Sequence, residues 1–587
     1  MTLATLFAAL ALSSAAVSQE AALAPLAPSA GKPAAAVLGA DHNARTLEVK
    51  FRHGSGVRLR GGHLVAAGDA LHTLNSFLDD REALRERVFA QSEEWLDAWR
   101  ASGEARSGRA LHDLNLFFRV TLPEEDRAGV AEIIQHLNAQ EIVEIAYPLG
   151  RVSDPIAPPA FAPPLLAPDF QSQQDYREAA PLGVDADYGN TFSGGRGEGH
   201  LIADVETGWT DDHEDVAHAA QGNYVGLPRT YYPWDHGTAV LGELVGEDND
   251  GGVLGLAHQA EVVLSTHQGN SANIPTATVY AAAACGPGDV VVLEVQCYGA
   301  PPGPFPCEYV ASTYAAVETA TANGIHVFAA AGNGNVNLDQ AAFGGLFDRN
   351  VRDSGAVMVG ASDGASLNKA GFSNYGTRLD AHGWGYNVVT AGYGDLYGAP
   401  NVTVEYTAAF SGTSSATPIV TGAGIILNGI HRECFGADMD PLALRALLTA
   451  TGTPQGAGGQ IGPRPHVRAA IEALGVPTIA LGGNLVPGGT ALISVTGTPG
   501  DAFQYAFAKT LAPAPTHRPP YGYLFLGPIA SFGGGTIGPA GVGTVTRPIP
   551  NDPNLSGRTV GYLQGRVTFA SGPGTGSFTN WVPVAIQ

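Results

Sequence analysis

Ser414 is a candidate nucleophile because it follows Gly-Thr in the stretch "FSGTSSATPIVTGAGIIL". A serine hydroxyl is a poor nucleophile at neutral pH. It needs a base within hydrogen-bond reach, and the base needs an acid to orient it. An apolar helix is predicted to begin at this serine, with Pro418 in its first turn, and a helix start favours negative charge. A serine that merely caps a buried helix has the same local pattern, so its chemistry depends on partners elsewhere in the chain.

Three other sites supply the residue types that such a serine needs. His236 precedes Gly-Thr at the start of a predicted helix, where it could act as the base. Glu206 ends an apolar stretch, and Asp204 lies two residues earlier on the same side of the predicted strand. Asn333 follows "VFAAAG", where its amide could donate to an oxyanion. Taken singly, each is as well explained as a cap, a structural carboxylate or a turn residue.

The elements that must bring these residues together are predicted between residues 181 and 475. Apolar stretches typical of buried parallel strands alternate there with helical patterns, and the stretches are 199–206, 260–266, 289–296, 324–332 and 355–363. The alternation predicts an α/β domain with a doubly wound, mainly parallel sheet. Ligand sites of such sheets lie at the carboxyl ends of the strands, and the four candidate sites fall at strand ends or helix starts.

The order carboxylate, histidine, asparagine, serine resembles that of the subtilisin-like serine peptidases (subtilases). The motifs "HGT" at 236–238, "AAAGN" at 329–333 and "GTSSATP" at 412–418 resemble the histidine, oxyanion and serine motifs of that family, and "GVLGLA" and "GFSNYG" match secondary signatures. The resemblance implies that Ser414 attacks a peptide carbonyl while His236 serves as general base and then general acid. It implies an oxyanion hole made of Asn333 and the backbone N–H of Ser414, and no cofactor for the chemistry.

The sequence departs from the family at the orienting acid. The family usually has Asp in an Asp-Thr/Ser-Gly motif, and Glu206 occupies that position here, before Thr207-Gly208. Glutamate carries the same charge on one more methylene and can orient an imidazolium if the backbone is set back. Asp204 remains the alternative acid.

The predicted substrate-binding strand departs as well. The family usually has Ser-Leu-Gly beside its first specificity pocket, whereas this chain has Glu294, Val295 and Gln296. A carboxylate at 294 could favour a basic residue before the scissile bond, or it could pair internally. The resemblance also assigns Ala330, Ala331 and Gly332 to substrate binding.

A structural calcium ion is a further implication of the resemblance. Carboxylate and carbonyl oxygens suit this hard cation. The residues that match ligating positions of the family are Asp215, Asp248, Asn249 and Asp250. The alternative is an acidic surface turn.

The N-terminal part of the chain is predicted to serve export and maturation. An apolar stretch within residues 1–18 fits a secretory signal peptide, which implies an extracellular or periplasmic enzyme. Residues 41–150 are predicted to form an α+β domain, with a helix over 81–105, that resembles an inhibitory propeptide. Residues 151–180 are a Pro-rich linker. In an exported chain four cysteines favour disulfides, and Cys297 with Cys307 is the favoured pair.

The composition and the C-terminal part of the chain narrow the possible partners and functions. The net charge of −24 argues against nucleic acid as a partner. Residues 476–587 alternate in hydrophobicity and predict an all-β sandwich. The predicted function is that of a secreted, monomeric serine endopeptidase that acts on polypeptides and has no transmembrane segment. The alternative is an inactive relative that binds peptides or surfaces. An α/β-hydrolase esterase is disfavoured because the serine lacks a G-x-S-x-G context.

Overall fold

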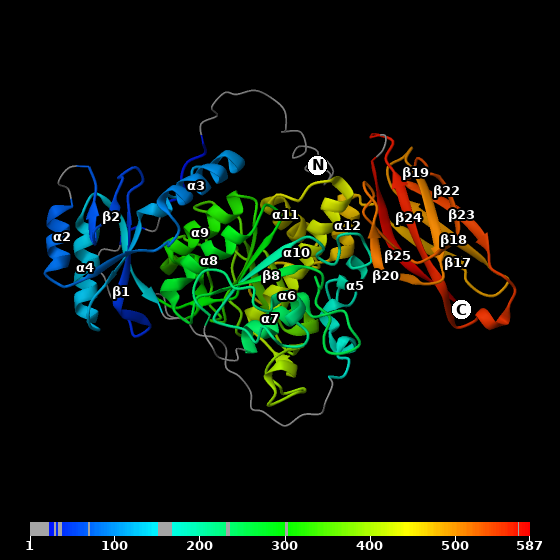
Figure 1. The fold of residues 1–587 in the computed structure, drawn as a ribbon, viewed down its shortest axis with the longest axis horizontal. Helices are drawn as coiled ribbons and strands as arrows, with labels where there is room; N and C mark the ends of the chain where they lie inside the picture. The colour runs from blue at the N-terminus through cyan, green and yellow to red at the C-terminus, as the bar shows by residue number, and fades with distance from the viewer. Residues whose placement is uncertain are drawn as a thin grey trace.

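The computed structural model describes residues 23–28, 31–32, 38–67, 71–150, 167–229, 235–299, 303–572 and 575–587. The predicted signal peptide and residues 151–166 of the predicted linker lie outside these residues. The described chain forms three groups of elements in a row, with a central α/β domain between an N-terminal group and a C-terminal group (Figure 1). Within the described ranges, no helix combines the length and apolar character that a membrane span requires.

The central domain is built on a six-stranded sheet in which every neighbouring pair of strands is parallel. In spatial order the strands are β14 (Ala381–Trp384), β13 (Val357–Ser362), β12 (His326–Ala330), β9 (Val290–Leu293), β7 (Leu201–Glu206) and β8 (Glu261–Thr266). The α/β fold predicted from the sequence is therefore confirmed. β14 was not anticipated, because a four-residue strand with a glycine gives no periodic signal.

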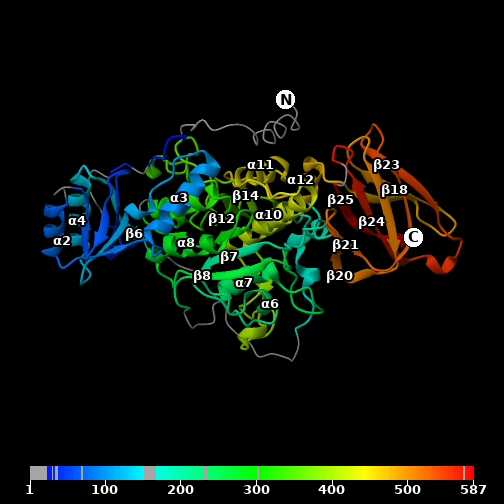
Figure 2. The same ribbon diagram turned by 45° about the horizontal axis from the view of Figure 1, so that its top comes forward.

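Helices cover both faces of this sheet (Figure 2). Ile202 of β7 packs in one apolar cluster with α7 and α10, whereas its neighbours Ala203 and Val205 pack in another cluster with α8 and α9. The helices are α5 (Ala186–Gly189), α6 (Ala217–Ala220), α7 (Asp235–Val245), α8 (Ile274–Ala284), α9 (Ala311–Ala322), α10 (Thr413–Phe435), α11 (Pro441–Thr451) and α12 (Val467–Leu474). Because side chains alternate along a strand, the even-numbered residues of β7 face α7 and α10.

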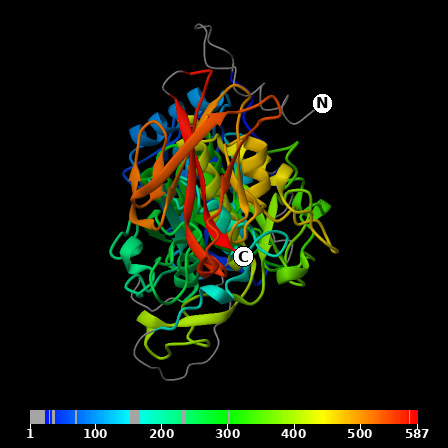
Figure 3. The ribbon, with the colours of Figure 1, turned by 90° about the vertical axis from the view of Figure 1, so that its right-hand side faces the viewer.

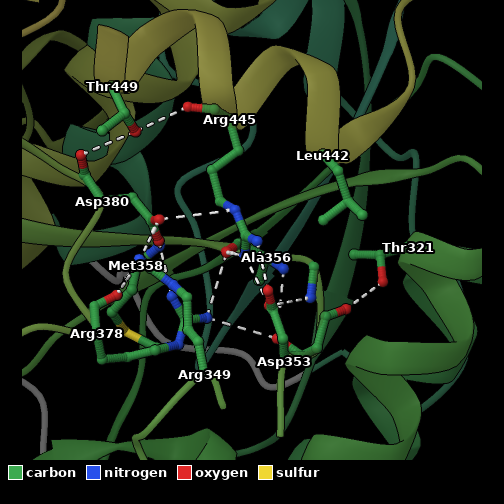
Figure 4. Close-up of polar contacts among 12 residues, drawn as sticks. Thr321, Arg349, Asp353, Ala356, Met358, Arg378, Asp380, Leu442, Arg445 and Thr449 are labelled. Atoms are coloured by element: carbon green, nitrogen blue, oxygen red, sulfur yellow. Dashed lines mark hydrogen bonds and ion pairs between the residues drawn. The ribbon is translucent and has the colours of Figure 1, made fainter. Parts of the chain in front are cut away.

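A buried ion network fastens α11 to the sheet (Figure 4). The guanidinium of Arg445 on α11 donates to both carboxylate oxygens of Asp353, at 2.7 and 2.5 Å. Asp380, just before β14, accepts from Arg378 at 2.7 Å and also from Arg349. Arg378 is only 2% exposed. The network therefore satisfies buried charges where α11 meets the start of β14.

The N-terminal group is an antiparallel sheet with helices. Its sheet has the order β4 (Leu84–Arg87), β5 (Phe117–Thr121), β1 (His42–Phe51) and β6 (Val143–Gly150), beside the hairpin β2 (Arg58–Arg60) and β3 (His63–Val65). Its helices are α2 (His72–Asp79), α3 (Glu93–Ser107) and α4 (Arg127–Ala139). The helix predicted over 81–105 is wrong in its first half. Residues 84–87 pair with β5, and tertiary pairing overrides the helical preference of "LRER".

The N-terminal group packs closely on the central domain. Helix α3 packs against α9 (Figure 1). An apolar cluster crosses the boundary and joins Phe89, Leu96 and Phe117 to Val279 of α8 and Ala315 of α9. Burial of such a cluster stabilises the contact between the two groups.

The C-terminal group consists mainly of antiparallel strands (Figure 3). One sheet has the order β17 (Ile479–Asn484), β18 (Thr490–Thr496), β23 (Val542–Pro548), and the other β22 (Ile529–Thr536), β19 (Ala502–Ala508), β24 (Arg558–Thr568), β25 (Gly576–Ile586). Strands β20 (Leu511–His517) and β21 (Tyr523–Leu526) form a hairpin. Side chains of both sheets, including Ile493 and Phe503, share one apolar cluster.

Candidate active site

Glu206 and His236 meet at the carboxyl end of β7. Glu206 is the last residue of this strand, and His236 lies in the first turn of α7. Oε1 of Glu206 is 2.5 Å from Nδ1 of His236, and both side chains are at least 95% buried. The other oxygen, Oε2, accepts the backbone N–H of Thr207 at 3.0 Å. A charge-assisted hydrogen bond of this kind fixes the imidazole orientation.

Gly237 allows α7 to start so close to the strand end. A Cβ added to Gly237 would lie 2.5 Å from the carbonyl oxygen of Gly208 and 2.6 Å from the Trp209 ring. The backbone N–H of Thr210 donates to the hydroxyl of Thr238 at 2.9 Å. The "HGT" motif therefore positions His236 through tight packing as well as through its own side chain.

Asp204, the alternative acid, is engaged elsewhere. Its Oδ2 accepts the indole N–H of Trp209 at 2.7 Å, and the side chain is fully buried. Burial, and then the nearby charge of Glu206, hold the pKa of Asp204 well above its usual range. The raised pKa favours the neutral form of Asp204.

Ser414 is the second residue of α10 and is 5% exposed. The chain enters α10 from β16 (Tyr406–Phe410), which pairs antiparallel with β15 (Val388–Ala391). The rings of Phe410 and His236 pack edge to face, with their centroids 5.5 Å apart. Pro418 lies in the second turn of α10, not in the first turn as the sequence predicted. Proline has no N–H, so Pro418 cannot donate the usual helical hydrogen bond to the carbonyl of Ser414.

The side chain of Asn333 is oriented by Thr413. Oδ1 of Asn333 accepts the backbone N–H and the hydroxyl of Thr413, both at 2.9 Å. A Cβ built on Gly412 would lie 3.2 Å from Nδ2 of Asn333 and 3.4 Å from the backbone nitrogen of Ser414. The two nitrogen donors thus border one small space that Gly412, at φ 122°, leaves open. Two converging N–H donors form the arrangement that stabilises an oxyanion.

The predicted substrate-binding residues differ in their surroundings. Val295, Ala330 and Ala331 are buried, whereas Gln296 is partly exposed. Glu294 is 4% exposed, and neither of its carboxyl oxygens has a hydrogen-bond partner within the described part of the chain. Burial, followed by the charges of Glu206, Asp204 and Glu243, raises the pKa of Glu294 well above 4.5. A neutral buried carboxyl offers little attraction to a basic substrate side chain.

Two of the predicted calcium ligands lie close together, since the Asn249 amide donates to Oδ1 of Asp215 at 3.4 Å. Asp215 is buried, and its Oδ2 accepts the backbone N–H of Val253 at 2.7 Å. Oδ2 of Asp248 lies 3.8 Å from Nε2 of His258. Among the described residues, no group of three or more His, Cys, Asp or Glu side chains could hold a metal ion. Calcium therefore stays a prediction, and no step of the chemistry depends on it.

Three features around the site were missed or left open by sequence reasoning. Thr413, which donates to the Asn333 side chain, was missed, although its place beside Ser414 in the serine motif was a usable signal. Gln296 accepts the backbone N–H of Asn333 at 2.9 Å, which no local pattern indicates. The favoured disulfide is confirmed, since Cys297 and Cys307 are bonded, while Cys285 and Cys434 are free thiols.

The profile of the Subtilase family matches residues 197–463. Subtilisin Savinase from Lederbergia lenta is 30% identical over 232 residues, which is 39% of this chain and 77% of Savinase. An alkaline protease from Alkalihalobacillus alcalophilus is also 30% identical over 232 residues, covering 54% of its length. The structure of the epidermin leader peptide processing serine protease of Staphylococcus aureus is 15% identical with a TM-score of 0.48, covering 73% of this chain and 98% of that protein.

The matched segment contains the strand end with Glu206, the helix with His236, the Asn333 loop and the Ser414 helix. The likeness to Savinase extends over three quarters of that enzyme. On this evidence the chain belongs to the subtilase family and is a serine-type endopeptidase.

Proposed function

We propose that the chain is an exported endopeptidase in which Ser414, His236 and Glu206 form the catalytic triad and Asn333 stabilises the oxyanion. The observation that carries this proposal is the 2.5 Å contact between Glu206 and His236. The convergence of Asn333 Nδ2 and the Ser414 backbone nitrogen on the space beside Gly412 supports it.

Acylation begins when Oγ of Ser414 attacks the scissile carbonyl carbon and His236 takes the serine proton. Glu206 stabilises the imidazolium that forms, while Asn333 and the Ser414 N–H donate to the oxyanion. The carbon–nitrogen bond then breaks as His236 gives its proton to the leaving amine. In deacylation a water molecule attacks the ester, His236 takes the water proton, and that proton returns to Ser414 as the acid product leaves.

Ser414→Ala tests the proposal. This variant should lose hydrolysis of casein and reaction with a fluorophosphonate, while its thermal unfolding stays close to that of the wild type. The competing proposal, an inactive relative that binds peptides or surfaces, rests on two departures from the family motifs: Glu206, and the segment 294–296 of the predicted substrate-binding strand. Strong fluorophosphonate labelling of the wild type that His236→Ala abolishes would rule out that alternative.

We also propose that the N-terminal group is an inhibitory propeptide. The hydroxyl of Ser271 donates to the carbonyl oxygen of Gly150, the last residue of β6, at 2.5 Å. The carboxylate of Glu48, a residue of β1, reaches the start of α9, where its Oε2 accepts from the hydroxyl of Ser312 at 2.5 Å. The dipole of α9 favours a negative charge at this end of the helix. The chain continues from Gly150 into the segment in which we propose that maturation occurs.

A further inference from the structure

The loop that carries Asn333 is held from three sides. Thr413 holds the side-chain oxygen of Asn333. Asn374 accepts the backbone N–H of Gly334 at 3.1 Å and that of Val336 at 2.8 Å. The third contact comes from Gln296, whose Oε1 accepts the backbone N–H of Asn333 at 2.9 Å.

Gln296 belongs to a short hairpin that a disulfide closes. In this hairpin β10 (Gln296–Cys297) pairs with β11 (Phe305–Pro306), and Cys297 is bonded to Cys307. Asn374 also links the hairpin to the Asn333 loop, because its amide donates to the carbonyl oxygen of Pro304 at 2.8 Å while its side-chain oxygen accepts the N–H of Gly334. The disulfide thus limits the freedom of the strand from which Gln296 reaches the loop.

Gln296 departs from the usual family motif, which has glycine at the matching position. Glycine has no side chain that could accept the Asn333 N–H. Gly332, which precedes Asn333, shows how closely the hairpin and the loop pack. A Cβ built on it would lie 3.3 Å from the backbone of Phe305 and 2.9 Å from the Asn374 amide.

We propose that Gln296 is a positioning residue for the reaction, which places the oxyanion donor Asn333 through its backbone N–H. This inference rests on the proposed function. Two anchors define where the Asn333 amide points: Thr413 sets the orientation of the carboxamide, and Gln296 sets the position of the main chain that carries it. An oxyanion donor contributes only when it lies at the correct distance from the developing charge, so displacement of the main chain weakens transition-state binding more than substrate binding.

Three substitutions separate this role from a merely structural one. Gln296→Met keeps the side-chain length and removes the strong acceptor. Gln296→Asn keeps the amide but draws it back by one methylene. Gln296→Glu keeps an acceptor at the original distance. Gln221→Met is the matched control, because Gln221 is an exposed glutamine at the C-terminal cap of α6.

The measurements are kcat and KM on a peptide p-nitroanilide that the wild type cleaves, and the Ki of a peptide boronate, which forms a tetrahedral adduct with the serine. We expect Gln296→Met and Gln296→Asn to lower kcat roughly tenfold, the factor that corresponds to losing one neutral hydrogen bond. KM should stay within about twofold, boronate affinity should fall by the same factor as kcat, and Gln296→Glu should restore most of the rate. Far-ultraviolet circular dichroism and thermal unfolding establish that each variant is folded.

Two results would overturn the inference. Unchanged kcat in folded Gln296→Met and Gln296→Asn would show that the contact does not position Asn333. A raised KM with unchanged kcat would make Gln296 a substrate-contacting residue, as the family resemblance implies. If Gln296→Met does not fold, the comparison of kcat between Gln296→Asn and Gln296→Glu tests the inference, and equal kcat values in these two variants would overturn it. Failure of the proposed function is distinguishable, because the wild type would then hydrolyse no peptide and Ser414→Ala would change nothing.

Discussion

Oε1 of Glu206 lies 2.5 Å from Nδ1 of His236, while the Asp204 carboxyl, two residues earlier on the same strand, binds the indole of Trp209. The longer glutamate side chain therefore reaches the histidine without help from Asp204. The position of Glu206 before Thr207-Gly208 and its contact with His236 both support Glu206 as the proposed orienting acid.

Glu206→Gln should lower kcat by about 10,000-fold, because a neutral amide stabilises neither the required tautomer nor the imidazolium. The rate is measured on a peptide p-nitroanilide across pH, with Asp204→Asn as the matched control. The control should lose less than about tenfold, since Asp204 is already favoured in its neutral form. The reverse pattern, a large loss only in Asp204→Asn, would make Asp204 the orienting acid.

Asn333→Ala should cost about 2.7–4 kcal/mol of transition-state stabilisation, or roughly 100- to 1,000-fold in kcat, with little change in KM. The reason is that the amide donates to charge that exists only in the transition state. Steady-state kinetics on the same substrate check the split. A comparable rise in KM with an intact kcat would assign Asn333 to substrate binding instead.

Gly150→Val should weaken inhibition by the N-terminal group. A Cβ at Gly150 would overlap the carbonyl oxygen of Tyr298, so β6 could not keep its present place. The test is the initial rate of fluorophosphonate labelling of the freshly folded full chain, which should rise in this variant. Gly482→Val is the control, because a Cβ there meets nothing within 4 Å. Equal labelling rates in both variants would count against the propeptide proposal.

Glu318→Gln should remove part of the pH dependence of stability. Burial raises the pKa of Glu318 to about 7 from an ordinary value of 4.5. The folded chain then holds a proton that the unfolded chain has lost, so this group lowers the free energy of unfolding as pH rises from 4.5 to about 7, by up to about 3 kcal/mol. Urea unfolding is measured across this range in the Ser414→Ala background, which prevents self-digestion.

The variant should have a flatter stability profile than its parent between those pH values. Glu472→Gln, at an exposed glutamate near the end of α12, is the control and should leave the profile unchanged. An identical slope in Glu318→Gln and its parent would mean that Glu318 titrates normally in the folded chain.

Arg378→Met should destabilise the central domain by about 3–5 kcal/mol, because it removes one of the two arginines paired with Asp380 (Figure 4) and takes from buried Glu308 the guanidinium with which it forms an ion pair. Arg468→Met is the matched control. Its side chain is 44% exposed and its ion pair with Asp185 spans 3.5 Å, so it should cost no more than about 1 kcal/mol. Thermal and urea unfolding of both variants compare the two costs, and equal values would refute the buried-pair argument.

The sequence by itself determined the α/β alternation and the four motifs that carry Glu206, His236, Asn333 and Ser414. Both signals are local. Buried parallel strands are continuous apolar runs, and each motif combines a reactive residue with glycines that a tight strand end or helix start requires. The disulfide between Cys297 and Cys307 was also favoured on proximity in the chain.

Only the tertiary structure decided which carboxylate contacts His236 and which side chains contact Asn333. Asp204 and Glu206 are of like charge, share one face of β7 and stand about 7 Å apart along it, so no local pattern separates them. The packing of Trp209 and α7 does. Gln296 follows the end of β9, and Asn333 follows the end of β12. Their hydrogen bond exists because β9 and β12 are parallel neighbours whose carboxyl ends lie at one edge of the sheet.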